Sequence, residues 1–208
     1  TTAYQFNNTE HAANLFGLKE FGNIYSRLGN PTVGALEARL TALEEGAMCV
    51  ALSSGTSAVM YSLINIMSQG DNFVTANQLY GGTYTMFDNI LPEYGINSKK
   101  VDITDLEAVE AAIDEKTRAI YCETITNPGL VVADISALAD IAHSKGIPLI
   151  VDATFTTSAI LKPFEYGADI VVYSLTKWMS GHGRVIAGAV IEKGGFDWGN
   201  GNFPLYDK

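Results

Sequence analysis

Two apolar runs, Ile147-Pro-Leu-Ile-Val-Asp152 and Ile170-Val-Val-Tyr-Ser-Leu-Thr-Lys177, decide the fold. Each run is short, rich in branched side chains and ends at polar residues, a pattern typical of strands that are buried on both faces of a parallel sheet. Ligands of such sheets bind at the carboxyl ends of the strands. We therefore expect Asp152, Ser174, Thr176 and Lys177 to meet at one rim of the sheet.

Strand-like runs alternate with helical patterns along most of the chain. Further strands are expected at 47–52, 72–76, 96–101, 118–122 and 185–191, and helices at 31–45, 57–67, 83–92, 106–113 and 135–144. The alternation predicts an α/β fold with a mainly parallel, doubly wound sheet and right-handed crossovers. Asn30 and Pro31 mark a helix start, and Thr104 with Glu107 predicts a capping box.

The first 30 residues show no clear periodicity, although 11–18 could form a short helix and 21–27 looks extended. Such a segment has little core of its own, so it is expected to lie on this domain or on a second subunit. We place one boundary, between an arm with its linking helix at 1–45 and an α/β domain at 46–208.

Composition and charge narrow the classes of function. The 208 residues are 47% hydrophobic and 17% charged with a net charge of −10, which argues against nucleic-acid and anionic-membrane partners because both favour basic patches. We find no bilayer-spanning run and no signal segment. Cys49 and Cys122 are expected to be buried free thiols, which fits a reducing cytoplasm. The three histidines are far apart and predict no metal site.

Lys177 and Asp152 are the candidate reactive pair. An amine held in an apolar pocket or beside a cation becomes a nucleophile toward carbonyls, and a carboxylate can keep a pyridine nitrogen protonated. With the hydroxyls of Ser174 and Thr176, which would share a face of one strand, this set suits an aldehyde, a ring nitrogen and a phosphate, as in pyridoxal phosphate. The plain alternatives are a surface lysine and a strand-end acid.

The turn Ser53-Ser54-Gly55-Thr56 opens a predicted helix and is the candidate phosphate site. Free amides at a helix start bind anions, and Gly55 would let a phosphate approach the backbone. An ordinary helix cap would have the same residues. No dinucleotide fingerprint or Walker loop follows the first strand, which disfavours nucleotide cofactors.

Three further sets of residues have two interpretations each. Tyr80 precedes two glycines and could lie over a ring and transfer protons, or simply pack. Tyr25 and Arg27 are two residues apart and could clamp a phosphate, or be exposed on a loop. Glu123 and Asn127 follow another strand and could orient a ring hydroxyl or hold the loop at Asn127-Pro128.

Several motifs in order resemble the pyridoxal-phosphate enzymes of cysteine and methionine metabolism. These motifs are Asn23-Ile-Tyr-Ser-Arg-Leu-Gly-Asn-Pro-Thr32, Ser54-Gly-Thr56, Tyr80-Gly-Gly-Thr83, Glu123-Thr-Ile-Thr-Asn-Pro128, Val151-Asp-Ala-Thr154 and Ser174-Leu-Thr-Lys177. The stretches 9–23 and 195–198 are most similar to O-acetylhomoserine sulfhydrylases.

The resemblance implies a type I pyridoxal-phosphate transferase fold and a role for each matching residue. Lys177 would form the Schiff base and move protons, and Asp152 would pair with the ring nitrogen. Tyr80 would stack on one ring face and assist loss of the γ-substituent, with Thr154 on the other face and Asn127 near the ring oxygen. The phosphate would be bound by Gly55, Thr56, Ser174 and Thr176, and by Tyr25 and Arg27 of a neighbouring subunit.

The implied reaction is γ-replacement on O-acetylhomoserine with sulfide or a thiol, giving homocysteine or methionine plus acetate. A homotetramer of active dimers is implied as well. Two alternatives remain: a lyase of the same family, and a non-catalytic nucleotide-binding module. Family members are longer and carry a C-terminal domain that is not recognisable here, and Arg184 replaces a small polar residue, so it either alters substrate choice or points outward.

Overall fold

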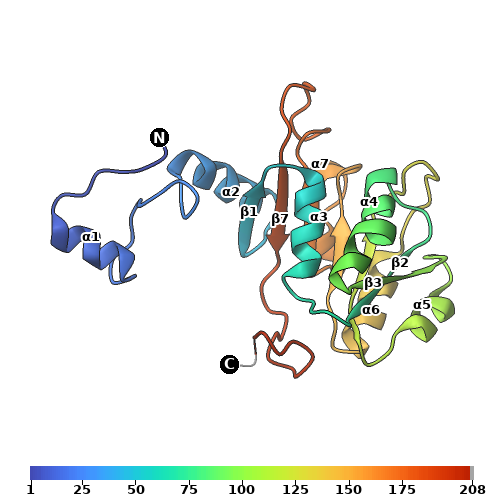
Figure 1. Cartoon of the computed structure of the whole chain (residues 1–208). Helices are drawn as coiled ribbons and strands as arrows, with labels where there is room; N and C mark the ends of the chain where they lie inside the picture. The colour runs from blue at the N-terminus through green and yellow to red at the C-terminus, as the bar shows by residue number, and fades with distance from the viewer. Residues whose placement is uncertain (207–208) are drawn as a thin grey trace.

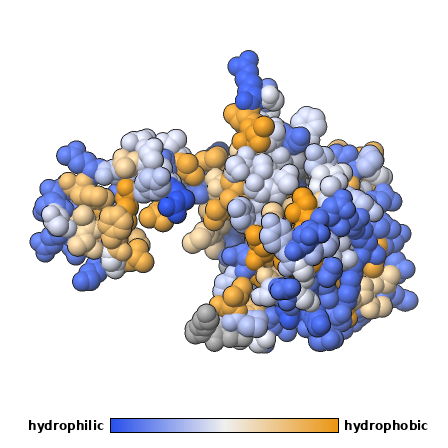
Figure 2. All heavy atoms as spheres, in the orientation of Figure 1, coloured by the Kyte–Doolittle hydropathy of each residue, from blue (hydrophilic) through white to orange (hydrophobic). Residues whose placement is uncertain are grey.

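The computed structural model describes residues 1–206, which form an N-terminal arm and an α/β body (Figure 1). The arm carries helix α1 (Thr9–Phe16) and leads into α2 (Pro31–Glu44), which packs against the first strand of the body. As predicted, the Asn30 side chain accepts hydrogen bonds at the start of α2, from the amides of Thr32 and Val33. Figure 2 shows hydrophobic colour over much of the arm. The exposed apolar side chains there include Phe16, Leu18, Phe21 and Leu28.

In the described chain, seven strands form one sheet with the order β1-β7-β6-β5-β4-β2-β3. The strands are β1 (Met48–Leu52), β2 (Asn72–Ala76), β3 (Asn97–Val101), β4 (Thr117–Glu123), β5 (Leu149–Asp152), β6 (Ile170–Ser174) and β7 (Gly188–Glu192). All neighbours pair in parallel except β7, which is antiparallel to both β1 and β6. The α/β fold with a mainly parallel sheet is therefore confirmed.

Helices cover both faces of this sheet, as right-handed crossovers require. One face carries α3 (Gly55–Ile64) and α4 (Gly81–Thr85), which continues into the π-helical turn η1 (Met86–Ile90) and the 3-10 turn η2 (Leu91–Tyr94). The other face carries α5 (Leu106–Ala112), α6 (Ile135–Ser144) and the 3-10 turn η3 (Pro163–Tyr166), and α6 contacts both of the others. The short helix α7 (Thr157–Ile160) lies in the connection between β5 and β6. No described helix has the length and hydropathy needed to cross a membrane.

The core lies between the sheet and its helices, and strands β5 and β6 are at its centre. Leu149, Ile150, Val171 and Val172 are fully buried. Beside them the ring of Phe87 makes edge-to-face contacts with Phe73 and Tyr121, at centroid distances of 4.7 and 5.2 Å. Cys49 and Cys122 are buried free thiols as expected.

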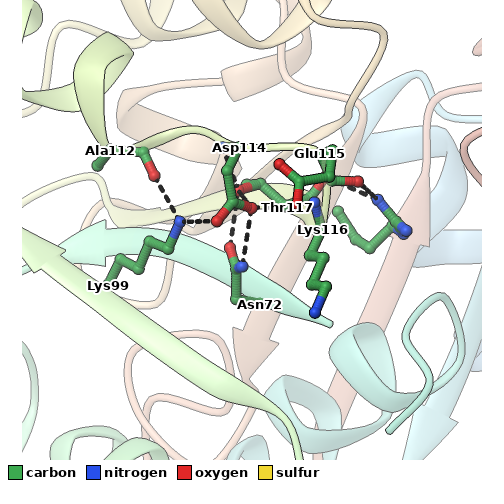
Figure 3. A network of polar contacts seen from close by, with 8 residues as sticks. Asn72, Lys99, Ala112, Asp114, Glu115, Lys116 and Thr117 are labelled. Atoms are coloured by element: carbon green, nitrogen blue, oxygen red, sulfur yellow. Dashed lines mark hydrogen bonds and ion pairs between the residues drawn. The ribbon is translucent and has the colours of Figure 1, made fainter. Parts of the chain in front are cut away.

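A polar network around Asp114 fastens the amino ends of β2, β3 and β4 (Figure 3). The Asp114 carboxylate accepts hydrogen bonds from the Asn72 amide group at 3.0 Å and from the Lys99 ammonium at 2.6 Å. It also accepts from the Lys116 backbone amide at 2.9 Å. This network lies at the opposite end of the strands from the polar rim, so it is structural.

Two local predictions were wrong. Asp105, rather than Thr104, caps α5 and accepts from the Ala108 amide, because the Thr104 hydroxyl donates to Asp102. The last strand begins at Gly188, and 185–187 belong to the loop that rises above the sheet between β6 and β7 (Figure 1). The segment 21–27 belongs to no helix or regular strand: Tyr25 forms an antiparallel bridge with Ala3, and the chain turns directly after it.

Candidate functional site

The polar residues at the strand ends meet around one cavity of about 710 Å³ at the carboxyl rim of the sheet. Every predicted site residue of the α/β body lines it: Gly55, Thr56, Tyr80, Asn127, Asp152, Thr154, Ser174, Thr176 and Lys177. Tyr25 and Arg27 do not, because they lie on the arm. There the Arg27 guanidinium is 5.5 Å from the centroid of the Tyr25 ring.

The start of α3 forms one wall of the cavity. Ser54 caps this helix by accepting a hydrogen bond from the Ser57 amide at 3.0 Å, which leaves the first-turn amides of Gly55 and Thr56 facing the rim. An anion is stabilised at such a helix start by the free N–H groups and the helix dipole.

Glycine is required at position 55 for a reason that the sequence did not show. A Cβ on Gly55 would lie 2.4 Å from the Cβ of Ser174 and 2.8 Å from its Cα. A Cβ on Gly188 of β7 would lie 2.0 Å from the carbonyl oxygen of Ser54. The two glycines therefore let the helix start pack directly on the ends of β6 and β7.

Asp152 ends β5 with its carboxylate held on two sides. One oxygen accepts from the Thr154 amide at 2.9 Å, and the other accepts from the Tyr121 hydroxyl at 3.3 Å. Burial raises the pKa of Asp152, against the lowering effect of these hydrogen bonds. Burial disfavours the ionised form of Asp152, so a cation bound on the cavity side would stabilise that ionised form.

Thr154 and Thr176 connect the strand ends rather than standing free in the cavity. The Thr154 hydroxyl accepts from the Ser174 amide at 2.7 Å. The Thr176 hydroxyl donates to the Ala187 carbonyl at 3.2 Å and accepts from the Ala187 amide at 3.1 Å. The prediction that Ser174 and Thr176 share a strand face was wrong, because β6 ends at Ser174 and the chain turns there.

Lys177 lies in that turn, directly after β6, with an exposed side chain that lines the cavity. The turn continues into Gly181 and Gly183, both with positive φ. Between them, a ring nitrogen of His182 lies 2.6 Å from the Ser180 carbonyl, so the histidine is part of the turn. Arg184 is exposed and does not line the cavity.

Glu123 holds the loops on the far side of the cavity. One carboxylate oxygen accepts from the Tyr80 amide at 2.7 Å and the other from the Asn127 amide at 3.1 Å. Burial, with a smaller contribution from the negative charge of Asp152, raises the pKa of Glu123 to about 7. Of the two sequence interpretations, the structure supports the one in which Glu123 holds the loop.

Sequence reasoning missed several residues of this cavity. Tyr121 does not line the cavity but is buried behind it, where its hydroxyl donates to Asp152; its position two residues before Glu123 on the same strand was an available signal. The apolar lining includes Phe155, Trp178 and Ile186, and only tertiary structure brings these three together. The described residues contain no group of three or more His, Cys, Asp or Glu side chains that could hold a metal ion.

The arrangement fits pyridoxal phosphate. The Asp152 carboxylate suits a protonated ring nitrogen, because burial opposes its ionised form and a bound cation would offset that effect. A lysine amine suits the aldehyde, and the start of α3 suits the phosphate. These three groups lie on one cavity, with Tyr80 beside them. Each group alone is common, but their joint placement is specific.

Comparisons with known proteins agree with this fit. The family model of the Cys/Met metabolism PLP-dependent enzymes matches residues 1–205. The O-acetyl-L-homoserine sulfhydrylase of Leptospira meyeri is 48% identical over 206 residues, which cover 99% of this chain and 47% of that protein. The chain thus spans about half the length of the curated relatives that it matches.

Two solved structures share the fold. One, from Campylobacter jejuni, is assigned to O-acetylhomoserine (thiol)-lyase and contains N′-pyridoxyl-lysine-5′-monophosphate; it has a TM-score of 0.91 and 43% identity over 94% of this chain and 49% of that one. The other is cystathionine γ-lyase from Lactobacillus plantarum, with a TM-score of 0.84 and 37% identity over 93% and 48%. These matches overturn the alternative of a nucleotide-binding module.

Proposed function

This chain belongs to the Cys/Met metabolism PLP-dependent enzymes, and from that premise we propose that it carries the catalytic half of an O-acetylhomoserine sulfhydrylase. The proposed reaction is γ-replacement on O-acetylhomoserine with sulfide or a thiol. The Cγ–O bond to acetate breaks, a Cγ–S bond forms, acetate takes the electron pair and the sulfur loses its proton. The observation that carries the proposal is the placement of Asp152, Lys177 and Tyr80 on one cavity with the start of α3.

Each residue has a definite task in this reaction. Bound pyridoxal phosphate supplies an aldehyde for the substrate amine and a protonated ring that withdraws electrons from Cα. Asp152 would hold the ring nitrogen protonated, and the amides of Gly55 and Thr56 would hold the phosphate. The Lys177 amine would take protons from Cα and Cβ of the substrate and return them. Tyr80, at the start of α4, would assist the departure of acetate.

Elimination by a lyase of the same family is the second candidate, because the chain is also similar to a cystathionine γ-lyase. The residues around the cavity serve both reactions, since both begin with proton removal at Cα and loss of a γ-substituent. Products separate them: homocysteine or methionine indicates replacement, whereas a keto acid and ammonia indicate elimination.

Tyr25 and Arg27 are proposed to complete the phosphate site of a second copy of the chain. They are exposed on the arm, which extends away from the body (Figure 1), so they cannot serve their own cavity in this arrangement. The proposal includes a homotetramer of such dimers and a cytoplasmic location. If Arg27→Ala weakens cofactor binding only in the oligomer, the arm completes a neighbouring site.

The first test is the visible absorbance of the purified protein with added pyridoxal phosphate. A yellow band that borohydride bleaches is expected in the wild type, and Lys177→Ala should lose or shift it. Lys116→Ala is the matched control, because Lys116 is an exposed lysine far from the cavity, in the network of Figure 3. If the folded wild type stays colourless, or if Lys177→Ala matches Lys116→Ala, the proposed role of this site is wrong.

A further inference from the structure

We infer that Glu123 is a positioning residue of the cofactor site, whose carboxylate holds Tyr80 and Asn127 in place and releases part of that hold when it is protonated. This inference rests on the proposed function, and it adds a residue to which the motifs gave no definite role. It is carried by two hydrogen bonds from different loops to one buried side chain.

The geometry requires a carboxylate. Glu123 ends β4 and is 5% exposed. Its two oxygens accept from the amides of Tyr80 and Asn127, at 2.7 and 3.1 Å. An ionised carboxylate accepts at both oxygens, whereas a protonated acid or an amide presents one acceptor and one donor. A neutral side chain at 123 can therefore satisfy only one of the two N–H groups.

The two loops that Glu123 joins carry residues that face the cavity. Tyr80 directly precedes α4, so a fixed amide sets the direction in which its ring enters the cavity. Asn127 lies four residues beyond the end of β4 and lines the same cavity. Loss of either hydrogen bond would let that loop move away from a bound ring. Glu123 therefore acts on the cofactor through its neighbours.

Protonation of Glu123 is expected within the neutral pH range. The titratable groups near it are Asp152 on β5 and Tyr121 and Cys122 on its own strand, and Tyr80 and Lys177 line the same cavity. Burial and the charge of Asp152 oppose its ionisation, and the two N–H groups favour it, so its pKa is about 7. A cation paired with Asp152 would remove part of the repulsion and so strengthen the hold on Tyr80.

The test compares cofactor binding by the wild type, Glu123→Gln and Glu107→Gln between pH 6 and pH 9. Glu107 is an exposed carboxylate on α5 and serves as the control. The dissociation constant of pyridoxal phosphate is measured by absorbance titration, together with the position of the visible band. At pH 8.5, Glu123→Gln should bind about tenfold more weakly than the wild type, because one hydrogen bond to a charged group is lost. The ratio of the two dissociation constants should approach one as the pH falls below 7.

The outcomes are distinct. A ratio that changes with pH near 7 for Glu123→Gln, but not for Glu107→Gln, supports the inference. A ratio that stays constant from pH 6 to 9, or an unchanged affinity in Glu123→Gln, overturns it while the proposed function stands. If the wild type itself does not bind the cofactor, the proposed function fails and the inference fails with it. Circular dichroism of each variant separates these results from misfolding.

Discussion

Replacing Gly55 by alanine should damage both the packing and the phosphate end of the site. The added Cβ would lie 2.4 Å from the Ser174 Cβ and 2.8 Å from its Cα. Carbon atoms pack best at about 3.5–4.0 Å, so the start of α3 and the end of β6 would have to separate by roughly 1 Å. The Ser174 Cα belongs to the backbone, so a change of rotamer cannot relieve the contact.

The expected cost follows from this overlap. Forcing an extra methyl into a packed region typically costs about 1–3 kcal/mol, so we expect the free energy of unfolding to fall by about 2 kcal/mol. For a chain of this size that corresponds to a loss of roughly 4–8 °C in Tm. Because the first-turn amides move with the helix start, binding of pyridoxal phosphate should weaken by about tenfold, the value of one hydrogen bond to a charged group.

Gly81→Ala is the matched control. Gly81 also opens a helix at the rim of the cavity, but a Cβ there would meet nothing within 4 Å. It should leave stability unchanged or raise it by about 0.5 kcal/mol, because alanine restricts the unfolded chain.

Thermal unfolding followed by circular dichroism, together with absorbance titration of the cofactor, measures both effects for the two variants. The reasoning is refuted if Gly55→Ala unfolds and binds cofactor like the wild type, or if Gly81→Ala loses as much as Gly55→Ala.

Two further predictions concern stability alone. Phe87→Ala should lower the free energy of unfolding by about 3–5 kcal/mol in urea titrations, because Phe87 is 1% exposed and its ring contacts Phe73 and Tyr121. A loss below about 1 kcal/mol would contradict this, because it would mean that neighbouring side chains fill the space left by the ring. Asp114→Asn should lower the free energy of unfolding by about 1 kcal/mol at pH 7. The reason is that several hydrogen bonds, the strongest from the Lys99 ammonium, lower the pKa of Asp114 below its ordinary 3.8. A group whose pKa is lowered by folding stabilises above its unfolded pKa and loses that contribution as the pH falls, so the difference between variant and wild type should shrink below pH 4; an equal difference at pH 7 and in strong acid would contradict this.

The order of strands and helices could be read from the sequence because each element has its own periodicity and local end signals. The buried runs at 147–152 and 170–174 are the clearest case, since a strand covered on both faces has no polar alternation to obscure it. The helix start was predicted well where one side chain makes the cap, as at Asn30. The prediction failed at Thr104, where two neighbouring residues could cap and the loop geometry chose Asp105.

The location of the candidate site could also be predicted from the sequence. In a parallel sheet the carboxyl ends of all strands meet at one rim, so Asp152, Ser174 and Lys177 had to come together once the strands were recognised. The sequence could not show what holds these residues, because the partners come from distant segments: Tyr80 and Glu123 are 43 residues apart. The backbone amides that Glu123 binds carry no sequence signal at all.

The sequence by itself determined the fold class, the rim at which the polar residues meet and the type of ligand that they suit, because these depend on local periodicity and side-chain chemistry. Only the tertiary structure decided that Gly55 and Gly188 are required for packing, that β7 runs antiparallel, and that Glu123 connects two loops. These features depend on distances between segments that are remote in the chain, and such distances are fixed only when the whole core packs at once.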